Sequence, residues 1–237
     1  NETLCAAPKY LGARLDGGYS DHIIVSHSRY LVSYGDMDPA VAAPYACSGL
    51  TAYSALKKIP SASEDDWIII IGAGGVGING VLLSPSVHKA KIIVVDNDAA
   101  KRQQAIEAGA DKVFSPDDQE EIRKIIGIGA KAAIDFVGRP ETTDLGLSLV
   151  KKGGLVIVVG LYGGSLKLSL PLIPMRSITL KGSYVGELRE LKELVEIIKL
   201  GNTKLITIKK QDLDTANQAM SDLRAGKVNG RIVLIPK

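Results

Sequence analysis

A glycine-rich turn that directly follows an apolar run places the strongest constraint on the fold of this 237-residue chain. Residues 67–71 read Trp-Ile-Ile-Ile-Ile, which is typical of a strand covered on both faces. Residues 72–77 read Gly-Ala-Gly-Gly-Val-Gly and open a helical stretch. Gly72 permits a tight turn, Gly74 lets a diphosphate approach the backbone, and Gly77 lets the helix pack closely on the strand. The sequence therefore predicts a dinucleotide site at a helix N-terminus.

An acidic residue at the end of the next predicted strand supports this interpretation. Asp96 follows the run Lys-Ile-Ile-Val-Val, nineteen residues after Gly77, which is the separation typical of a ribose-binding carboxylate. A carboxylate accepts hydrogen bonds from both ribose hydroxyls and repels a 2′-phosphate, so Asp96 favours NAD over NADP. Lys101 and Arg102 lie one helical turn further on and leave NADP open as the alternative.

Short apolar runs alternate with helical patterns through the middle of the chain, as in a parallel α/β sheet. The expected strands are residues 67–71, 91–95, 112–114, 132–137, 155–159 and 178–184. The expected helices begin near Val76, run over 99–109, present Ile122, Ile125 and Ile126 on one face, and run over 142–150. Pro85 makes the first helix either short or kinked. Six strands with helical crossovers predict a doubly wound dinucleotide-binding fold.

The flanking segments show other patterns. Gly17 and Gly18 precede alternating apolar and polar residues, which predicts a loop and an antiparallel strand near 19–25. After Gly186, the apolar residues Leu188, Leu191, Val195 and Ile198 recur at helical spacing, and a further helix near 213–223 precedes a closing strand at 231–235. We expect three units, namely residues 1–44, 45–186 and 187–237.

Composition excludes several classes of protein. Hydrophobic residues make up 46% of the chain and charged residues 23%, which is typical of a globular domain. The net charge of +3 is spread along the chain without a basic block, so neither nucleic acid nor a membrane surface is an expected partner. Five glycines and an asparagine interrupt the most apolar stretch, residues 67–83, and argue against a membrane span. Two cysteines exclude a disulfide framework. Because the chain starts at Asn1, we expect it to begin partway through a longer protein.

Several segments together resemble the medium-chain zinc-dependent alcohol dehydrogenase family. Besides the glycine turn, they are residues 16–20, 43–53, 135–138, 158–161, 181–186 and 230–234. The stretch around Cys47 is specific to this family. The resemblance implies an α/β fold in which a doubly wound parallel (Rossmann) sheet is flanked by parts of a β-rich GroES-like catalytic domain, whose N-terminal part is missing here. It also implies NAD and zinc as cofactors.

The resemblance assigns metal ligands to both cysteines. Cys47 resembles a ligand of the catalytic zinc, and Cys5 resembles the last of four cysteines in a structural zinc lobe. From the residues alone, Cys47 could be a small buried hydrophobe and Cys5 a lone free thiol. The family's other catalytic ligands, a cysteine and a His-Glu pair, have no counterpart here. The three histidines, His22, His27 and His88, are interpreted as structural or surface residues.

Cofactor contacts are also implied by the resemblance. Thr51, Val185 and the segment Val159–Leu161 resemble residues at the nicotinamide, Lys101 a residue at the adenosine ribose, and Arg231 an arginine at the pyrophosphate. The full set of expected cofactor contacts is Thr51, Gly72, Gly74, Gly75, Val76, Gly77, Asp96, Lys101, Phe136, Val137, Val159, Gly160, Leu161, Val185 and Arg231. The hydrophobic members could equally be core residues, and Arg231 a solvated charge.

The function implied is hydride transfer between an alcohol and NAD⁺ to give an aldehyde or ketone. Its expected partners are a small alcohol or carbonyl substrate and further copies of the chain, in a cytoplasmic homodimer or homotetramer. In the family, the last strand of the cofactor sheet often pairs with its equivalent in a partner subunit, a role open to residues 178–184. Two alternatives are a zinc-free quinone or enone reductase of the same superfamily and a non-catalytic nucleotide-binding protein.

Overall fold

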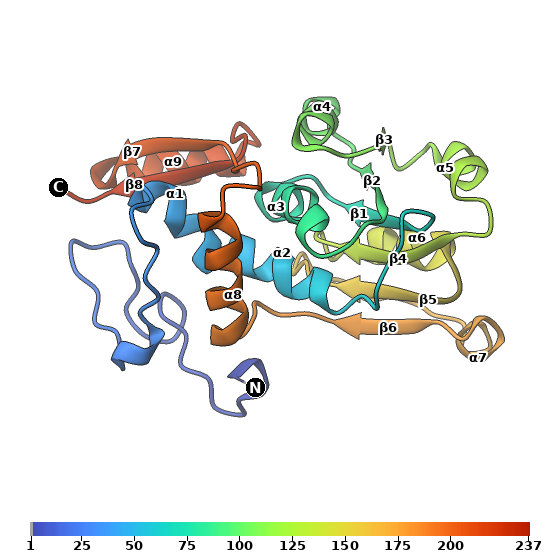
Figure 1. Ribbon diagram of the computed structural model, residues 1–237, viewed down its shortest axis with the longest axis horizontal. Helices are drawn as coiled ribbons and strands as arrows, with labels where there is room; N and C mark the ends of the chain where they lie inside the picture. The colour runs from blue at the N-terminus through green and yellow to red at the C-terminus, as the bar shows by residue number, and fades with distance from the viewer. Residues whose placement is uncertain (1) are drawn as a thin grey trace.

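The computed structural model describes residues 2–237 and contains a six-stranded sheet (Figure 1). All its strands are parallel and lie in the order β3-β2-β1-β4-β5-β6. They are β1 Trp67–Ile71, β2 Lys91–Val95, β3 Lys112–Phe114, β4 Ala130–Asp135, β5 Val150–Val158 and β6 Thr179–Gly182. This order is that of the doubly wound dinucleotide fold, so the predicted fold class is confirmed. Asn1, the first residue of the predicted 1–44 unit, lies outside the described residues.

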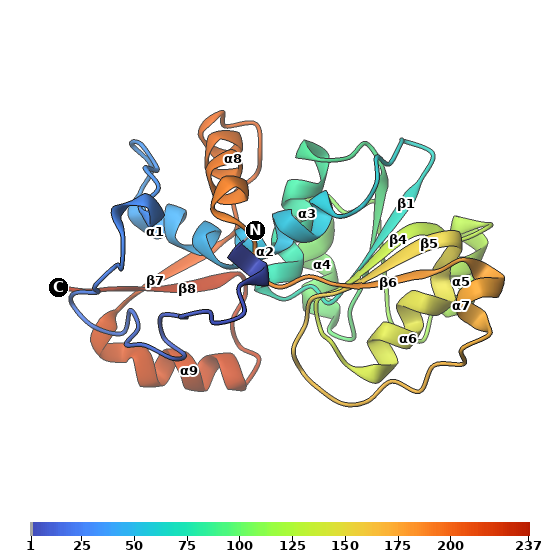
Figure 2. The same ribbon diagram turned by 90° about the horizontal axis from the view of Figure 1, so that it is seen from below.

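Helices cover both faces of the sheet (Figure 2). Ile68 and Ile70 of β1 point to the face packed by α2, α3 and α4, whereas Ile69 and Ile71 point to the face packed by α5 and α6. The helices are α2 Ser48–Lys57, α3 Gly75–Leu83, α4 Ala99–Ala108, α5 Gln119–Ile126 and α6 Pro140–Leu149. Because alternate residues of a strand face opposite sides, burial of both faces explains the unbroken isoleucine run.

The local predictions hold in most places. Helix α3 ends at Leu83 and a 3₁₀ turn over Ser84–Ser86 takes up Pro85, so the helix is short. Of the three isoleucines expected on one face of α5, Ile122 and Ile126 are buried, whereas Ile125 is 37% exposed. Ile125 is three residues from Ile122 and so lies on the same side of the helix, at the exposed edge of the buried stripe. Helix α2 and the short helix α7, Leu172–Arg176, were not predicted.

The flanking segments form a second, smaller group of elements beside α2 (Figure 1). They comprise α1 Pro39–Ala42, α8 Leu188–Lys199, β7 Ile208–Asp212, α9 Ala216–Arg224 and β8 Arg231–Ile235, with β7 and β8 paired in parallel. Helix α8 and strand β8 confirm the predictions, whereas the polar strand β7 carries no apolar signal and was missed. The predicted strand near 19–25 is wrong, because this segment pairs with no strand and Ile24 is 88% exposed.

None of the helices within residues 2–237 combines the length and the apolar character needed to cross a membrane. Residues 67–83 fold as strand β1, the glycine turn and helix α3.

An ion-pair cluster ties β1, β4 and β5 together at the amino end of the sheet. Asp66 Oδ1 lies 2.8 Å from Lys151 Nζ, and its Oδ2 lies 3.2 Å from Lys131 Nζ. The backbone N–H of Ser63 also donates to Oδ2, over 3.1 Å. The hydrogen bond from Lys151, followed by those from Ser63 and Lys131, holds the pKa of Asp66 well below its usual range.

We expect Asp66→Asn to lower the melting temperature at pH 7 by about 2–4 °C, which corresponds to about 1 kcal/mol for ion pairs that solvent partly screens. Because the folded-state pKa is depressed, this stabilisation is present above the unfolded-state pKa, near 4, and is lost as the pH falls further. Melting curves of wild type and variant should therefore converge in acid. Asp65→Asn, at an exposed neighbour, is the matched control, and a constant difference at every pH would contradict the assignment.

Candidate functional site

Most of the predicted cofactor residues follow strand ends at the carboxyl edge of the sheet, defined here as the ends of β1, β2, β4 and β5. The turn of residues 72–77, the glycine cradle, follows β1, and Asp96 follows β2. Phe136 follows β4 and Val159 follows β5. Strands β1 and β4 are neighbours whose onward connections go to opposite sides of the sheet, and ligands of doubly wound sheets bind at such a point.

The glycine cradle has the contacts expected of a diphosphate site. A Cβ on Gly77 would lie 1.8 Å from the carbonyl oxygen of Gly72, so only glycine allows α3 to start so close to the turn. A Cβ on Gly74 would meet no atom within 4 Å, and Gly74 is exposed. The space above Gly74 is therefore open at the N-terminus of α3, where unpaired N–H groups and the helix dipole favour an anion.

The Asp96 carboxylate is fixed against this cradle. Its Oδ2 accepts a 2.7 Å hydrogen bond from the backbone N–H of Ala73, and its Oδ1 accepts one of 2.9 Å from Asp98. Each oxygen keeps a further lone pair for a ribose hydroxyl. Arg102 donates from Nη1 to the backbone oxygen of Asp96 over 2.7 Å, and Lys101 is half-buried on the same helix, α4. Arg102 thus stays near the acid.

Arg231 reaches the cradle from β8. A Cβ on Gly75 would lie 2.6 Å from Arg231 Cδ and 2.8 Å from its Nη1, so the arginine lies directly against the start of α3. It therefore brings a positive, forked donor group from the last strand of the chain to the predicted diphosphate position. The interpretation of Arg231 as a fully solvated charge does not fit this half-buried placement.

A buried aspartate organises the neighbouring strand ends. Asp135 is fully buried, and its Oδ1 accepts the N–H groups of Val137 and Gly138, both over 2.9 Å. Its Oδ2 accepts the hydroxyls of Thr142 and Thr143, both over 2.8 Å. Its backbone oxygen accepts the N–H groups of Val159 and Gly160, at 2.9 and 3.0 Å. Sequence reasoning missed this organising role of Asp135. An acidic residue at the end of an apolar strand is the local signal that could have indicated it.

These bonds place the two predicted cofactor segments side by side. Phe136 and Val137 are half-buried, Val159 is buried, and Leu161 is 77% exposed. Leu161 is therefore not a core residue, which leaves its side chain free to contact a ligand. Val185 lies further along the chain with φ 49°, a left-handed conformation that a β-branched residue adopts only under strain, and such strain concentrates at functional sites.

Helix α2 carries Thr51 and begins directly after Cys47. The N–H of Thr51 donates to the carbonyl oxygen of Cys47 over 2.8 Å, and Thr51 is half-buried. Cys47 is a free, exposed thiol, so its interpretation as a small buried hydrophobe is wrong. Cys5 is also free and exposed. The accessible Cys47 thiol is thus available to a ligand at the start of α2.

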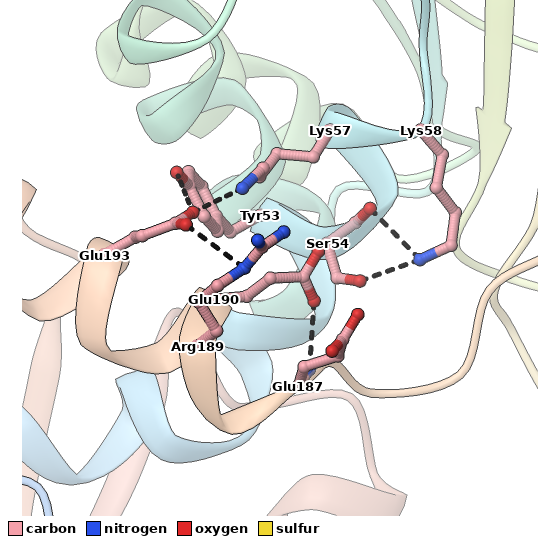
Figure 3. A network of polar contacts seen from close by, with 8 residues as sticks. All are labelled: Tyr53, Ser54, Lys57, Lys58, Glu187, Arg189, Glu190 and Glu193. Atoms are coloured by element: carbon pink, nitrogen blue, oxygen red, sulfur yellow. Dashed lines mark hydrogen bonds and ion pairs between the residues drawn. The ribbon is translucent and has the colours of Figure 1, made fainter. Parts of the chain in front are cut away.

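A polar network holds α2 against α8 (Figure 3). Glu193 of α8 pairs with Lys57, accepts a 3.4 Å hydrogen bond from the Tyr53 hydroxyl, and lies 3.6 Å from Arg189 Nε. The bond from Lys57 lowers the pKa of Glu193, whereas burial, followed by the charge of Glu193, raises the pKa of Tyr53 to about 12. Within α2 and its C-cap, Lys58 donates to Ser54 Oγ over 2.7 Å, and burial lowers the pKa of Lys58. Glu193 therefore joins α8 to Tyr53 and Lys57 of α2.

The residues present fit a nicotinamide dinucleotide, but they do not by themselves fit a metal. The open cradle, the fixed Asp96 carboxylate and Arg231 match diphosphate and ribose. No group of three or more His, Cys, Asp or Glu side chains in residues 2–237 is arranged to hold a metal ion. His22 and His27 are exposed, and His88 is buried with its Nε2 2.9 Å from the oxygen of Leu56, as expected of surface and structural histidines.

Fold and site together define a dinucleotide-binding α/β protein. Residues 75–200 match the model of the family described as zinc-binding dehydrogenase. The chain belongs to the zinc-binding dehydrogenase family. The predicted family is thereby confirmed.

Relatives and a solved structure are similar to this chain over nearly its whole length. An NAD-dependent alcohol dehydrogenase of Sulfurisphaera tokodaii is 35% identical over 99% of this chain and 69% of its own length. One of Sulfolobus acidocaldarius is 37% identical over 97% and 67%. The crystal structure of the alcohol dehydrogenase from the hyperthermophilic archaeon Aeropyrum pernix aligns with a TM-score of 0.86 at 30% identity, covering 99% of this chain and 70% of that one.

Proposed function

We propose that this chain belongs to an NAD-dependent alcohol dehydrogenase, which transfers hydride between an alcohol and NAD⁺ and yields an aldehyde or ketone. The observation that carries the proposal is the Asp96 carboxylate, held 2.7 Å from the N–H of Ala73 inside the glycine cradle. The relatives from Sulfurisphaera and Sulfolobus are named for this activity. When bound, NAD⁺ supplies the hydride acceptor.

The chain's own residues have distinct roles in this proposal. Gly74, Gly75 and the α3 N-terminus receive the diphosphate, and Arg231 balances its charge. Asp96 accepts hydrogen bonds from the adenosine ribose. At the other end of the carboxyl edge, the side chains and backbone that would position the nicotinamide and its ribose are those of Thr51, Val137, Val159, Gly160, Leu161 and Val185. Phe136 would lie beside the adenosine half of the cofactor.

Catalytic zinc enters the proposal through Cys47. An exposed thiol can ionise and serve as a zinc ligand, but a catalytic zinc takes three protein ligands. Cys47 would therefore be one ligand of a site that other residues complete, and Cys5 is proposed in the same sense for a structural zinc. In the full-length protein, Cys47→Ala is expected to lose the catalytic zinc, and metal content equal to that of wild type would contradict the assignment.

Self-association is proposed through the free edge of the sheet. Strand β6 is an edge strand whose four residues are all exposed, which leaves backbone groups open to pairing. An apolar cavity of about 470 Å³ lies beside it, lined in part by Leu168, Leu172 and Leu180. We propose a cytoplasmic homodimer or homotetramer that pairs β6 strands. Sedimentation of Leu180→Lys against wild type tests the interface.

The activity itself is tested with purified protein, NAD⁺ or NADP⁺ and a series of primary and secondary alcohols. NADH formation that depends on alcohol is the expected result. If the protein binds NADH but reduces enones or quinones instead of oxidising alcohols, the hypothesis of a zinc-free reductase replaces that of an alcohol dehydrogenase. If the protein binds NADH but turns over neither class of substrate, the hypothesis of a non-catalytic nucleotide-binding protein replaces both.

Asp96→Ala is expected to weaken NAD⁺ binding by about tenfold to a hundredfold, because two hydrogen bonds to a charged acceptor are lost. Use of NADP⁺ should suffer less, because the variant no longer repels a 2′-phosphate and Arg102 lies beside the vacated position. The ratio of kcat/KM for the two cofactors measures the effect. Asn97→Ala, at the exposed neighbouring residue, is the control, and an unchanged ratio in Asp96→Ala would assign cofactor choice to another residue.

A further inference from the structure

Helix α3 contains a buried polar side chain in an otherwise apolar sequence, Gly-Val-Gly-Ile-Asn-Gly-Val-Leu-Leu. Asn79 is 0% exposed. Burial of an amide is unfavourable unless its donors and acceptor are satisfied. Its Oδ1 finds no partner among the described residues. Fold stability alone therefore does not explain an asparagine here.

The donors of Asn79 link two helix starts. Nδ2 donates to the carbonyl oxygen of Gly75 over 2.9 Å and to Ser48 Oγ over 3.2 Å. Ser48 is itself buried and donates from Oγ to the carbonyl oxygen of Pro44 over 3.0 Å. A continuous chain of hydrogen bonds thus runs from the glycine cradle to the first residue of α2. Helices α2 and α3 pack side by side along this contact (Figure 2).

The two linked segments serve opposite ends of the cofactor in the proposed function. Gly75 belongs to the diphosphate cradle. Ser48 directly follows Cys47 and lies three residues before Thr51, which we place at the nicotinamide end. Two helix starts that touch mainly through apolar side chains can slide relative to each other, whereas a directional hydrogen bond fixes their register. From its place in α3, the Asn79 amide meets both segments.

We propose that Asn79 is a positioning residue that holds the start of α2, with Cys47 and Thr51, in register with the diphosphate cradle. Through Ser48 it sets where the nicotinamide end lies once the diphosphate is bound. This inference rests on the proposed function. It assigns no chemistry to Asn79, which touches neither the cofactor nor the substrate.

Asn79→Ala separates positioning from stability. Truncation leaves Ser48 Oγ bonded to Pro44 and removes the unpaired Oδ1, so the melting temperature should stay within about 4 °C of wild type or rise. Affinity for ADP-ribose, which lacks the nicotinamide, should stay within about twofold. Affinity for NADH should fall about threefold to tenfold, and kcat for alcohol oxidation about tenfold to a hundredfold, because a small misplacement of reacting groups is costly.

Ser48→Ala tests the link itself. It should reproduce the Asn79→Ala pattern, and the double variant should be no worse than Asn79→Ala, because both remove the same connection. Ser54→Ala is the matched control, since Ser54 is equally buried in α2 but bonds to Lys58 away from the cradle. It should leave kcat within twofold.

The outcomes are distinguishable. Equal losses of ADP-ribose and NADH affinity in Asn79→Ala, or additive effects of the two variants on kcat, would overturn the positioning role. So would a kcat within twofold of wild type. If wild-type protein binds neither ADP-ribose nor NADH, the proposed function fails first, and the role of Asn79 toward the cofactor fails with it.

Discussion

Replacing Gly74 with alanine is expected to weaken NAD⁺ binding by about tenfold to a hundredfold while the protein stays folded. The added Cβ meets no protein atom within 4 Å, and its φ of −71° suits alanine. The methyl group would instead occupy the open space in which we place the diphosphate. Alanine is a poorer N-cap than glycine, so the melting temperature should fall by no more than about 4 °C.

Gly77→Ala is the contrasting variant in the same cradle. Its Cβ would lie 1.8 Å from the backbone oxygen of Gly72, so helix and turn must separate. We expect a loss of at least about 3 kcal/mol in the free energy of unfolding, the upper part of the overpacking range, together with loss of NAD⁺ binding. Calorimetry and titration with NADH measure both quantities. Unchanged NADH affinity in folded Gly74→Ala would show that the diphosphate does not approach this backbone.

The sheet and the cradle were predictable because their signals are local. A strand buried on both faces needs apolar residues throughout, a tight turn before a helix needs glycine, and a ribose site needs a carboxylate such as that of Asp96. Each of these needs is visible in a short stretch of sequence, as is the alternation of strands and helices. All six strands of the sheet were found, with boundaries displaced by a few residues at β4, β5 and β6.

The rest depends on contacts that sequence distance hides. Strand β7 is polar and exists because β8, more than twenty residues later, pairs with it. The segment 19–25 has the alternation of a strand but no partner within the described residues. The link from Asn79 to Ser48 joins residues that no local pattern relates, and the approach of Arg231 to Gly75 was implied only by the family resemblance. Contacts of this kind depend on the fold, so local sequence patterns do not predict them.

Asp135→Ala is expected to lower the free energy of unfolding by about 3–5 kcal/mol. The carboxylate is fully buried and accepts four hydrogen bonds, two from backbone N–H groups and two from threonine hydroxyls. Alanine would leave the N–H groups of Val137 and Gly138 without an acceptor, and each unpaired buried donor costs about 1–3 kcal/mol. The loop bearing Phe136 and Val137 should loosen, so NADH affinity should fall with stability.

Asp135→Asn and Asp117→Ala make this result interpretable. The asparagine oxygen can still accept the two N–H groups while its amide donates to the threonine oxygens, so its loss should be smaller, about 1–2 kcal/mol. Asp117 is exposed, and its replacement should change little. Urea unfolding can be followed by the fluorescence of Trp67, the one tryptophan in the sequence, which lies in β1. A loss below about 1 kcal/mol in Asp135→Ala would mean that water replaces the carboxylate, and that this aspartate does not organise the carboxyl edge.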